Sequence, residues 1–234
     1  MSKLLPVRFS SRGTPAVELE GVLHAPQGAG EWPAAIVCHP HPLGGGSMYN
    51  PVVTAIARAL AEAGVIALRF NFRGAGHSGG QHDYGRGEQE DVGGAVDWLL
   101  NQPVVDPWRM SVAGYSFGAW VGLSYAQQDP RVTAVAAVGL TAWHYDDEFG
   151  RTHELPGLGV ESWQFDPGFM RSFTRPKLFV GGERDAFAPP GLLRAFVERI
   201  PEPKTLHMLP GVDHFFQGRE REVGDLVAGF AASL

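Results

Sequence analysis

The regular alternation of short apolar runs with segments of helical periodicity constrains the fold of this chain more than any other feature. The apolar runs are typical of strands, and they are AAIVCHP (34–40), VIALRFNF (65–72), RMSVAGYS (109–116), AVAAVGL (134–140), PKLFVGG (176–182) and the weaker KTLHMLP (204–210). Because each run is apolar along most of its length, we expect central strands that are covered on both faces.

Segments of helical periodicity separate these runs. Apolar residues recur at the spacing of a helix in residues 53–63, 92–99, 193–200 and 223–230. A strand followed by a helix, repeated along the chain, predicts an α/β fold with a mostly parallel central sheet and helices on both faces. The first two strand-like stretches, LPVRFSS (5–11) and VELEGVLHAP (17–26), have no helix between them, so we expect them to form an antiparallel hairpin.

Composition excludes several classes of protein. Of the 234 residues, 44% are hydrophobic and 19% are charged, which is typical of a globular domain. The formal net charge is −6, and basic residues do not cluster, so nucleic acid is not an expected partner. The N-terminal residues do not resemble a signal peptide, and no apolar stretch is long enough to span a membrane. We therefore expect a cytoplasmic protein, whose oligomeric state the composition leaves open.

One stretch interrupts the alternation. Between about Thr141 and Pro176, aromatic residues, acidic residues and glycines replace the regular pattern. We interpret this stretch, at about 141–176, as a short lid insertion within a single domain that covers residues 1–234. Its aromatic residues either line an apolar pocket or pack the insertion onto the body, and they are Trp143, Tyr145, Phe149, Trp163, Phe165, Phe169 and Phe173. The acidic run at 146–148 is expected to lie on the surface.

The strongest chemical signal is GYSFG, from Gly114 to Gly118. It follows the apolar run RMSVA and precedes the helical segment AWVGLSYAQQ, which is the context that a G-x-S-x-G nucleophile elbow requires. In such an elbow the serine occupies a strained turn between strand and helix, and the glycines remove side chains that would clash. The alternative, a glycine-bearing turn with an incidental serine, is disfavoured by the strand and the helix. Ser116 is therefore the candidate nucleophile.

A nucleophilic serine needs a base and an acid that orients the base, expected in the order Ser, Asp or Glu, His. Asp185 lies just after a predicted strand, and His214 lies in the loop that precedes the final helix. Both positions belong to the edge of a parallel sheet where active-site loops gather. Glu183 and Asp213 are rival acids, but Asp213 adjoins His214 in the chain and is poorly placed to face it. We predict that Asp185 and His214 complete the triad.

The chain resembles the α/β-hydrolases over nearly its whole length, since HPHPLGGGSMYNPVV, RFNFRGAGHSGG, GYSFG, GGERDAFAPP and GVDHFF follow the order of that family. It is most similar to small bacterial serine hydrolases with little cap, near the dienelactone-hydrolase and acyl-peptidase branches. It departs from the dienelactone enzymes, which carry cysteine at the elbow, and from haloalkane dehalogenases, which carry aspartate there. The resemblance implies an α/β-hydrolase fold and an ester, thioester or amide hydrolase that needs no cofactor.

The resemblance also suggests a role for HPHPLGGG, residues 39–46. In the family, the loop after the third strand supplies one backbone N–H of the oxyanion hole, and the residue after the nucleophile supplies the other. The second donor would be Phe117. For the first, the prolines at 40 and 42 have no N–H to give, and alignment with the H-G-x loops of the family favours His41, with Leu43 as the fallback.

Two motifs permit a competing interpretation, as a metal site and as a dinucleotide site. The two histidines of HPH could belong to a metal site, but Leu43 and Gly44 stand where an H-x-H-x-D-H run would have Asp and His. The motif GAGHSG (74–79) mimics a dinucleotide fingerprint, but no helix begins within it. We therefore predict neither a metal nor a cofactor. Cys38, the only cysteine, lies inside a predicted strand and is expected to be a small buried hydrophobe.

Taken together, these features predict a serine hydrolase that cleaves carboxylic esters of small-molecule acyl substrates. Ser116 would attack the carbonyl, His214 would take and return the proton, and Asp185 would orient the imidazole. Thioester or amide hydrolysis, peptidase activity and acyl transfer stay open on the same triad. A non-catalytic α/β-hydrolase scaffold that acts as a binding protein is the alternative from another class, and an intact triad argues against it.

Overall fold

The structure is a computed structural model, and it describes residues 3–28, 30–141 and 167–234. Its centre is an 8-stranded sheet with the strand order β1-β2-β4-β3-β5-β6-β7-β8. The strands are β1 (Lys3–Ser10), β2 (Glu18–Ala25), β3 (Trp32–Cys38), β4 (Ile66–Phe70), β5 (Val105–Tyr115), β6 (Val132–Val138), β7 (Lys177–Gly182) and β8 (Lys204–Leu209).

The sheet is mostly parallel, as the sequence predicts. Strand β1 pairs with β2 antiparallel, and β2 pairs with β4 antiparallel, so the predicted hairpin is confirmed. Every pairing from β4 through β3, β5, β6 and β7 to β8 is parallel. The strands β3, β4, β6 and β7 are almost fully buried, whereas β1 and β8 at the two edges alternate largely between exposed and partly buried residues. Continuous apolar runs therefore mark the strands that are covered on both faces.

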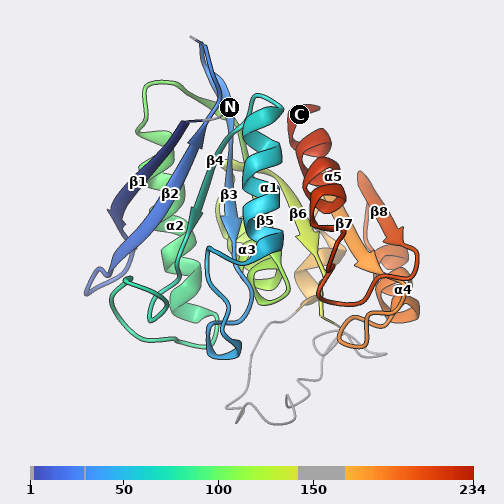
Figure 1. The fold of residues 1–234 in the computed structure, drawn as a ribbon. Helices are drawn as coiled ribbons and strands as arrows, with labels where there is room; N and C mark the ends of the chain where they lie inside the picture. Colours follow the sequence, from blue (N-terminus) through green and yellow to red (C-terminus); the bar gives the residue numbers. More distant parts are fainter. Residues whose placement is uncertain (1–2, 29, 142–166) are drawn as a thin grey trace.

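Helices cover both faces of the sheet (Figure 1). They are α1 (Pro51–Glu62), α2 (Arg86–Leu100), α3 (Phe117–Gln128), α4 (Pro190–Arg199) and α5 (Glu220–Ala232). Helices α1 and α5 pack on one face and share one cluster of buried apolar residues. Helices α2, α3 and α4 contribute to a second cluster on the opposite face. This arrangement confirms the predicted α/β architecture.

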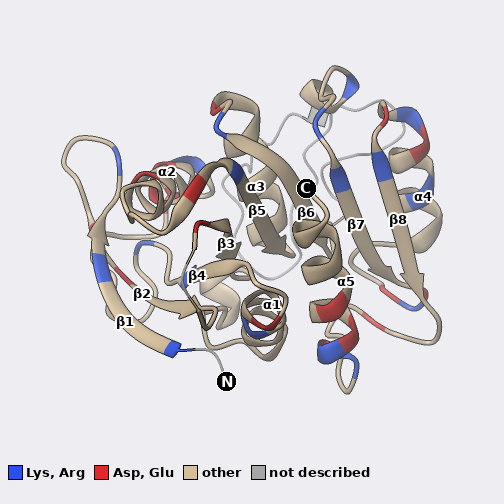
Figure 2. Ribbon diagram, turned by 90° about the horizontal axis from the view of Figure 1, so that it is seen from above, with Lys and Arg blue, Asp and Glu red and all other residues tan. Residues whose placement is uncertain are grey.

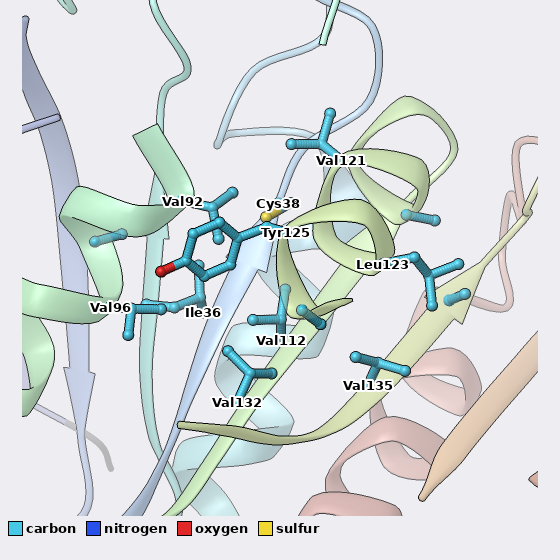
Figure 3. Close-up of a cluster of buried hydrophobic side chains, with 14 of the residues drawn as sticks. Ile36, Cys38, Val92, Val96, Val112, Val121, Leu123, Tyr125, Val132 and Val135 are labelled. Atoms are coloured by element: carbon cyan, nitrogen blue, oxygen red, sulfur yellow. The ribbon is translucent and has the colours of Figure 1, made fainter. Parts of the chain in front are cut away.

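The cluster beneath α2 and α3 contains the only cysteine. Figure 3 shows Cys38 at the end of β3, among side chains of neighbouring strands and of two helices. The side chains from the helices include Val92 of α2 and Val121 and Tyr125 of α3. Cys38 is fully buried, and this burial raises the pKa of its thiol well above the ordinary value. A thiol that stays protonated in an apolar setting behaves as a small hydrophobe. The prediction for Cys38 is confirmed.

The carboxyl ends of the parallel strands lie at one edge of the sheet, which is the lower edge in Figure 1. The loops that follow β3, β4, β5, β7 and β8 start from this edge. It is the place where open α/β sheets assemble their ligand sites.

Most of the predicted lid insertion lies outside the described residues. This holds for Trp143, Tyr145, Phe149, Trp163 and Phe165, and for the acidic run at 146–148. The last part of the stretch is described, and it contains the short 3₁₀ helix η3 (Pro167–Arg171). Here Met170 and Phe173 are buried in the same cluster as α3 and α4. The end of the predicted insertion therefore belongs to the body of the fold.

Charged residues are distributed around the periphery of the sheet. Figure 2 shows acidic and basic residues intermixed on the helices and at strand ends, while the middles of the central strands are largely uncharged. An apolar centre of this kind matches the burial of those strands. Among the described residues, no helix has the length and the apolar character that crossing a membrane requires.

Candidate active site

Ser116 occupies a strained turn between β5 and α3. It is the N-cap residue of α3, and its backbone has φ 55° and ψ −117°. Positive φ is costly for a residue with a side chain, by about 1–3 kcal/mol, and such strain is found mostly at functional sites. The turn is held by a hydrogen bond from the Ser116 N–H to the Val138 carbonyl oxygen, at 2.8 Å. Ser116 is only half-buried, although the residues on both sides of it are buried.

The two glycines of GYSFG are each required, for separate steric reasons. A Cβ at Gly114 would lie 2.1 Å from the carbonyl oxygen of Gly118, so the strand could not pass under the first turn of the helix. A Cβ at Gly118 would lie 2.5 Å from the carbonyl oxygen of Cys38. Gly118 therefore allows the N-terminus of α3 to pack directly against the end of β3. This contact brings Ser116 beside the loop that follows β3.

The side chains of Ser116, His214 and Asp185 form a continuous hydrogen-bonded chain. His214 Nε2 lies 3.0 Å from Ser116 Oγ, and His214 Nδ1 lies 2.8 Å from Asp185 Oδ2. Asp185 is 2% exposed and His214 is 7% exposed. The structure thus brings together three residues that come from the ends of β5, β7 and β8. In this arrangement an imidazole can accept the serine proton while a buried carboxylate stabilises the resulting imidazolium.

Asp185 is held in place by its own loop. Its Oδ1 accepts hydrogen bonds from the N–H groups of Phe187, at 2.8 Å, and Ala188, at 2.7 Å. One carboxylate oxygen is therefore used by the backbone, and the other is left for His214. The consequence is a carboxylate whose orientation is set before any substrate arrives.

The rival acids are engaged elsewhere. Glu183 is exposed and pairs with Arg194 at 3.5 Å. Asp213 is also exposed, and its Oδ1 accepts the N–H of Phe215 at 2.9 Å. Neither carboxylate contacts the imidazole in the hydrogen bonds of the described residues. Of these three carboxylates, Asp185 is the one that contacts the imidazole among the described residues.

Two residues that support His214 have no signal in the sequence. The Tyr115 hydroxyl donates a hydrogen bond to the His214 carbonyl oxygen at 2.8 Å. Burial raises the pKa of Tyr115, so this hydroxyl stays a donor at neutral pH. Gly139 has φ 56°, and a Cβ there would lie 3.2 Å from His214 Cε1. Only long-range packing reveals these roles, because Tyr115 and Gly139 are far from His214 in the chain.

The loop after β3 reaches the N-terminus of α3. The rings of His41 and Phe117 have their centroids 5.1 Å apart, so the two candidate N–H donors belong to segments in contact. His41 precedes the 3₁₀ helix η1 (Pro42–Gly44), and its Nδ1 accepts the N–H of Leu43 at 3.1 Å. The fallback donor Leu43 is therefore already engaged by the His41 side chain. The backbone N–H of His41 remains the preferred candidate.

The glycines of HPHPLGGG form backbone hydrogen bonds within the loop. The N–H groups of Gly44 and Gly46 both bond the carbonyl oxygen of His41, at 3.0 and 2.9 Å. A Cβ at Gly46 would lie 2.1 Å from the Pro40 carbonyl oxygen, so no other residue fits there without movement. The glycines thus shape a compact turn that presents His41.

His39 connects the loops that follow β3 and β4, and it is unsuited to bind a metal. Its Nε2 accepts the N–H of Phe72 at 3.0 Å, and its Nδ1 lies 2.6 Å from the Pro40 carbonyl oxygen, to which it donates. His39 is fully buried, and burial lowers its pKa to about 4, so the ring is neutral near pH 7. Both ring nitrogens are used by the backbone. Among the described residues, no cluster of His, Cys, Asp and Glu has the arrangement of a metal site.

The motif GAGHSG (74–79) lies in the loop after β4, and α2 does not begin until Arg86. A dinucleotide fingerprint needs the helix to begin within the motif, so its structural context is absent here. Gly76 serves a different purpose, since a Cβ there would lie 2.1 Å from Asn71 Nδ2. The glycines allow this loop to fold over a buried polar side chain.

A histidine that the sequence analysis did not single out lies beside the loop after β3. The ring of His82 lies 4.9 Å from that of His41 and 5.5 Å from that of Phe117. Its Nδ1 lies 2.7 Å from Oε1 of the fully buried Glu88. Burial opposes the ionisation of Glu88, but its contacts with His82 and the Asp83 N–H outweigh this effect and hold its pKa below the ordinary value.

His41 itself is neutral at this site. Burial, and to a smaller extent the neighbouring His82, lower the pKa of His41 to about 4. A neutral ring agrees with an Nδ1 that accepts the Leu43 N–H. The side chain of His41 therefore shapes the loop and carries no charge near pH 7.

A sequence model of the X-Pro dipeptidyl-peptidase (S15) family matches residues 14–165. This span includes Ser116 and ends before Asp185 and His214. It also covers the loop after β3, the loop after β4 and the elbow, which are the segments that surround the serine.

Two solved structures and one relative are also similar to this chain. An α/β serine hydrolase homologue from Coxiella burnetii is 31% identical, with a TM-score of 0.77 over 95% of this chain and 96% of that chain. An α/β serine hydrolase without lid from Xanthomonas campestris is 28% identical, with a TM-score of 0.74 over 98% of this chain and 93% of that chain. A thiohydrolase of Arthrinium phaeospermum is 40% identical over 86 residues, which are 36% of this chain and 28% of that protein.

Proposed function

The chain belongs to the α/β-hydrolase superfamily, within the family that the S15 model describes, and from this premise we propose that it is a serine hydrolase that cleaves carboxylic esters through an acyl-enzyme intermediate. The observation that supports this proposal most directly is the chain of hydrogen bonds from Ser116 through His214 to Asp185. The proposed substrate is a small-molecule acyl ester.

In the proposed acylation step, Ser116 Oγ attacks the carbonyl carbon while His214 Nε2 takes the serine proton. Asp185 stabilises the imidazolium through Nδ1. The backbone N–H groups of His41 and Phe117 are the proposed donors to the oxyanion of the tetrahedral intermediate. His214 then gives its proton to the alcohol oxygen, the bond from that oxygen to the carbonyl carbon breaks, and the acyl group stays on Ser116. In deacylation, His214 takes a proton from a water molecule whose oxygen attacks the carbonyl carbon. The bond from that carbon to Ser116 Oγ then breaks, Oγ receives the proton from His214, and the acid is released.

A fluorophosphonate is expected to label the protein once, at Ser116, because the reagent reacts with a serine that a neighbouring base activates. Mass spectrometry of the labelled peptide checks the position, and EDTA is expected to leave ester hydrolysis unchanged. Labelling at another residue, or activity lost to the chelator, would contradict the proposal. A protein that neither reacts with the reagent nor hydrolyses any ester in an acyl-chain series would favour the non-catalytic scaffold.

Peptide and thioester hydrolysis are the candidate activities that specific observations favour as alternatives. The matching family is described as X-Pro dipeptidyl-peptidases, and one relative is described as a thiohydrolase. We expect the ester to be preferred when an ester and a thioester of the same acyl group, and a dipeptide nitroanilide ending in proline, are compared by kcat/KM. Preference for the nitroanilide or the thioester would move the assignment to that class.

The backbone N–H of His41 is tested by a proline substitution. His41 has φ −53° and ψ 120°, which proline adopts without strain, so His41→Pro removes the N–H while keeping the backbone angle. We expect kcat to fall by about 10²–10³-fold, the usual loss for one oxyanion-hole donor. His41→Ala keeps the N–H and is expected to retain activity within about tenfold of the unaltered protein.

Circular dichroism and thermal melting are needed to show that both variants are folded before their rates are compared. If His41→Ala proved as damaging as His214→Ala in a folded protein, the imidazole of His41 would itself take part in the reaction. The assignment of the backbone N–H as donor would then be wrong.

A further inference from the structure

The proposed reaction places one demand on the surroundings of His214. In acylation, the proton that His214 Nε2 takes from Ser116 must end on the oxygen of the departing alcohol. That oxygen must therefore lie within hydrogen-bonding distance of Nε2. Whatever the alcohol carries as its substituent must lie beside the His214 ring, on the side of Ser116 away from the oxyanion donors.

Two of the aromatic side chains next to His214 are partly exposed. The ring of Phe187 lies 4.8 Å from the ring of His214, tilted by 34°. The ring of Phe215 lies 5.9 Å from His214 and meets Phe187 edge to face at 6.0 Å. Phe187 is 38% exposed and Phe215 is 62% exposed, which is unusual for side chains of this size.

A second group of aromatic side chains lies around the loop after β3. His41, His82 and Phe117 contact one another around this loop. Phe187 and Phe215 contact His214 and each other. In the proposed reaction, the group around the loop after β3 lies next to the donors to the carbonyl oxygen, and the two phenylalanines lie next to the base that protonates the alcohol.

Backbone hydrogen bonds hold both phenylalanines in place. The Phe187 N–H is bound by Asp185 Oδ1, and the Phe215 N–H is bound by Asp213 Oδ1. The next residue, Phe216, is fully buried at φ 53° and anchors the loop. The two rings therefore belong to the loops that also carry the proposed acid and base. Asp213 fixes the backbone of Phe215 and does not contact the imidazole.

We propose that Phe187 and Phe215 form a subsite for the leaving group, and that this subsite takes a planar, apolar alcohol such as an arylmethyl alcohol. The inference rests on the proposed function. A ring placed against an edge-to-face pair can make the offset or edge contacts that aromatic groups prefer. It also removes from water the apolar surface of Phe215, which is favourable.

The test compares two acetates that differ only in the alcohol. Benzyl acetate and methyl acetate give the same acetyl-enzyme, so deacylation is common to both, and kcat/KM reports acylation. For each variant, the ratio of kcat/KM for benzyl acetate to that for methyl acetate is measured. Dividing this ratio by the ratio of the unaltered protein cancels the intrinsic reactivity of the two esters. The variants are Phe215→Ala, Phe187→Ala and the double variant.

We expect the double variant to lower this ratio by about tenfold, the size of effect that the loss of aromatic contacts produces. Phe187→Leu with Phe215→Leu keeps apolar volume but removes the rings, and it should recover only part of the loss. Trp108→Ala is the matched control, because Trp108 is also an exposed aromatic residue, at 83%, but lies near the opposite end of β5. It should leave the ratio unchanged.

The outcomes separate this inference from the proposed function. An equal loss for both esters would mean that the rings position His214 and do not bind the alcohol, which would overturn the inference. Rates in the double variant that stayed at the level of the unaltered protein for both esters would overturn it as well, while the proposed hydrolase would stand. If the unaltered protein hydrolysed neither ester and reacted with no fluorophosphonate, the proposed function would fail first and this inference with it.

Discussion

Ser116→Ala is expected to lower kcat for ester hydrolysis by about 10⁶-fold, the scale seen when a nucleophilic serine is removed from a triad. The remaining rate would come from the proposed oxyanion donors and from substrate binding alone. Steady-state assays with the best ester of an acyl-chain series check the loss, and the same variant should no longer react with a fluorophosphonate. A variant that kept more than a few per cent of the activity would remove Ser116 from the mechanism.

The fold of this variant is expected to survive. The strain at position 116 lies in the backbone, at φ 55°, and alanine keeps it unchanged. The hydrogen bond from the backbone N–H to Val138 is also kept, because it does not involve the side chain. Melting temperature and circular dichroism should therefore match the unaltered protein closely, so that the loss of activity reports chemistry.

Asp185→Asn is expected to lower kcat by about 10⁴-fold, or about 5.4 kcal/mol of transition-state stabilisation. The reason lies in how the two oxygens are used. The N–H groups of Phe187 and Ala188 both donate to Oδ1, so an asparagine should turn its own oxygen toward them. Its NH₂ then faces His214 Nδ1 and donates to it. This contact selects the tautomer with the proton on Nε2, which cannot accept the proton of Ser116.

Asp213→Asn is the matched control for this prediction. The Asp213 carboxylate accepts a single backbone N–H, from Phe215, and an asparagine oxygen can accept the same bond. We expect activity within a few-fold of the unaltered protein, measured as kcat with the same ester. A larger loss for Asp213→Asn than for Asp185→Asn would mean that the acid has been assigned to the wrong residue.

The architecture was largely predictable from local patterns. Strands buried on both faces have few polar positions, so β3, β4, β6 and β7 are visible as continuous apolar runs. The elbow was equally visible, since the steric needs of Gly114 and Gly118 leave their mark within five consecutive residues. The packing of the C-terminal end of the predicted insertion was less predictable. Nothing in the local pattern of Met170 and Phe173 indicates that they join the core.

The proposed site was predictable only in part. Chain order and the likeness to a family pointed to Asp185 and His214, whose catalytic roles stay predictions. The structure brings their side chains to Ser116, and it also directs Glu183 toward Arg194. Which of several nearby carboxylates meets the imidazole depends on the direction each side chain takes at the end of its strand, and spacing alone carries little of that information.

The residues that local patterns miss altogether are those whose partners are distant in the chain. Tyr115 supports a carbonyl that lies 99 positions away, and His82 reaches the loop after β3 from the loop after β4. Sequence establishes the strands, the helices and the strained serine, because periodicity and steric conflict act between neighbours. The surroundings of His214, with the two phenylalanines beside it, arise from the packing of loops at one edge of the sheet. Such contacts depend on the positions of whole elements, so they become visible only when the chain is folded.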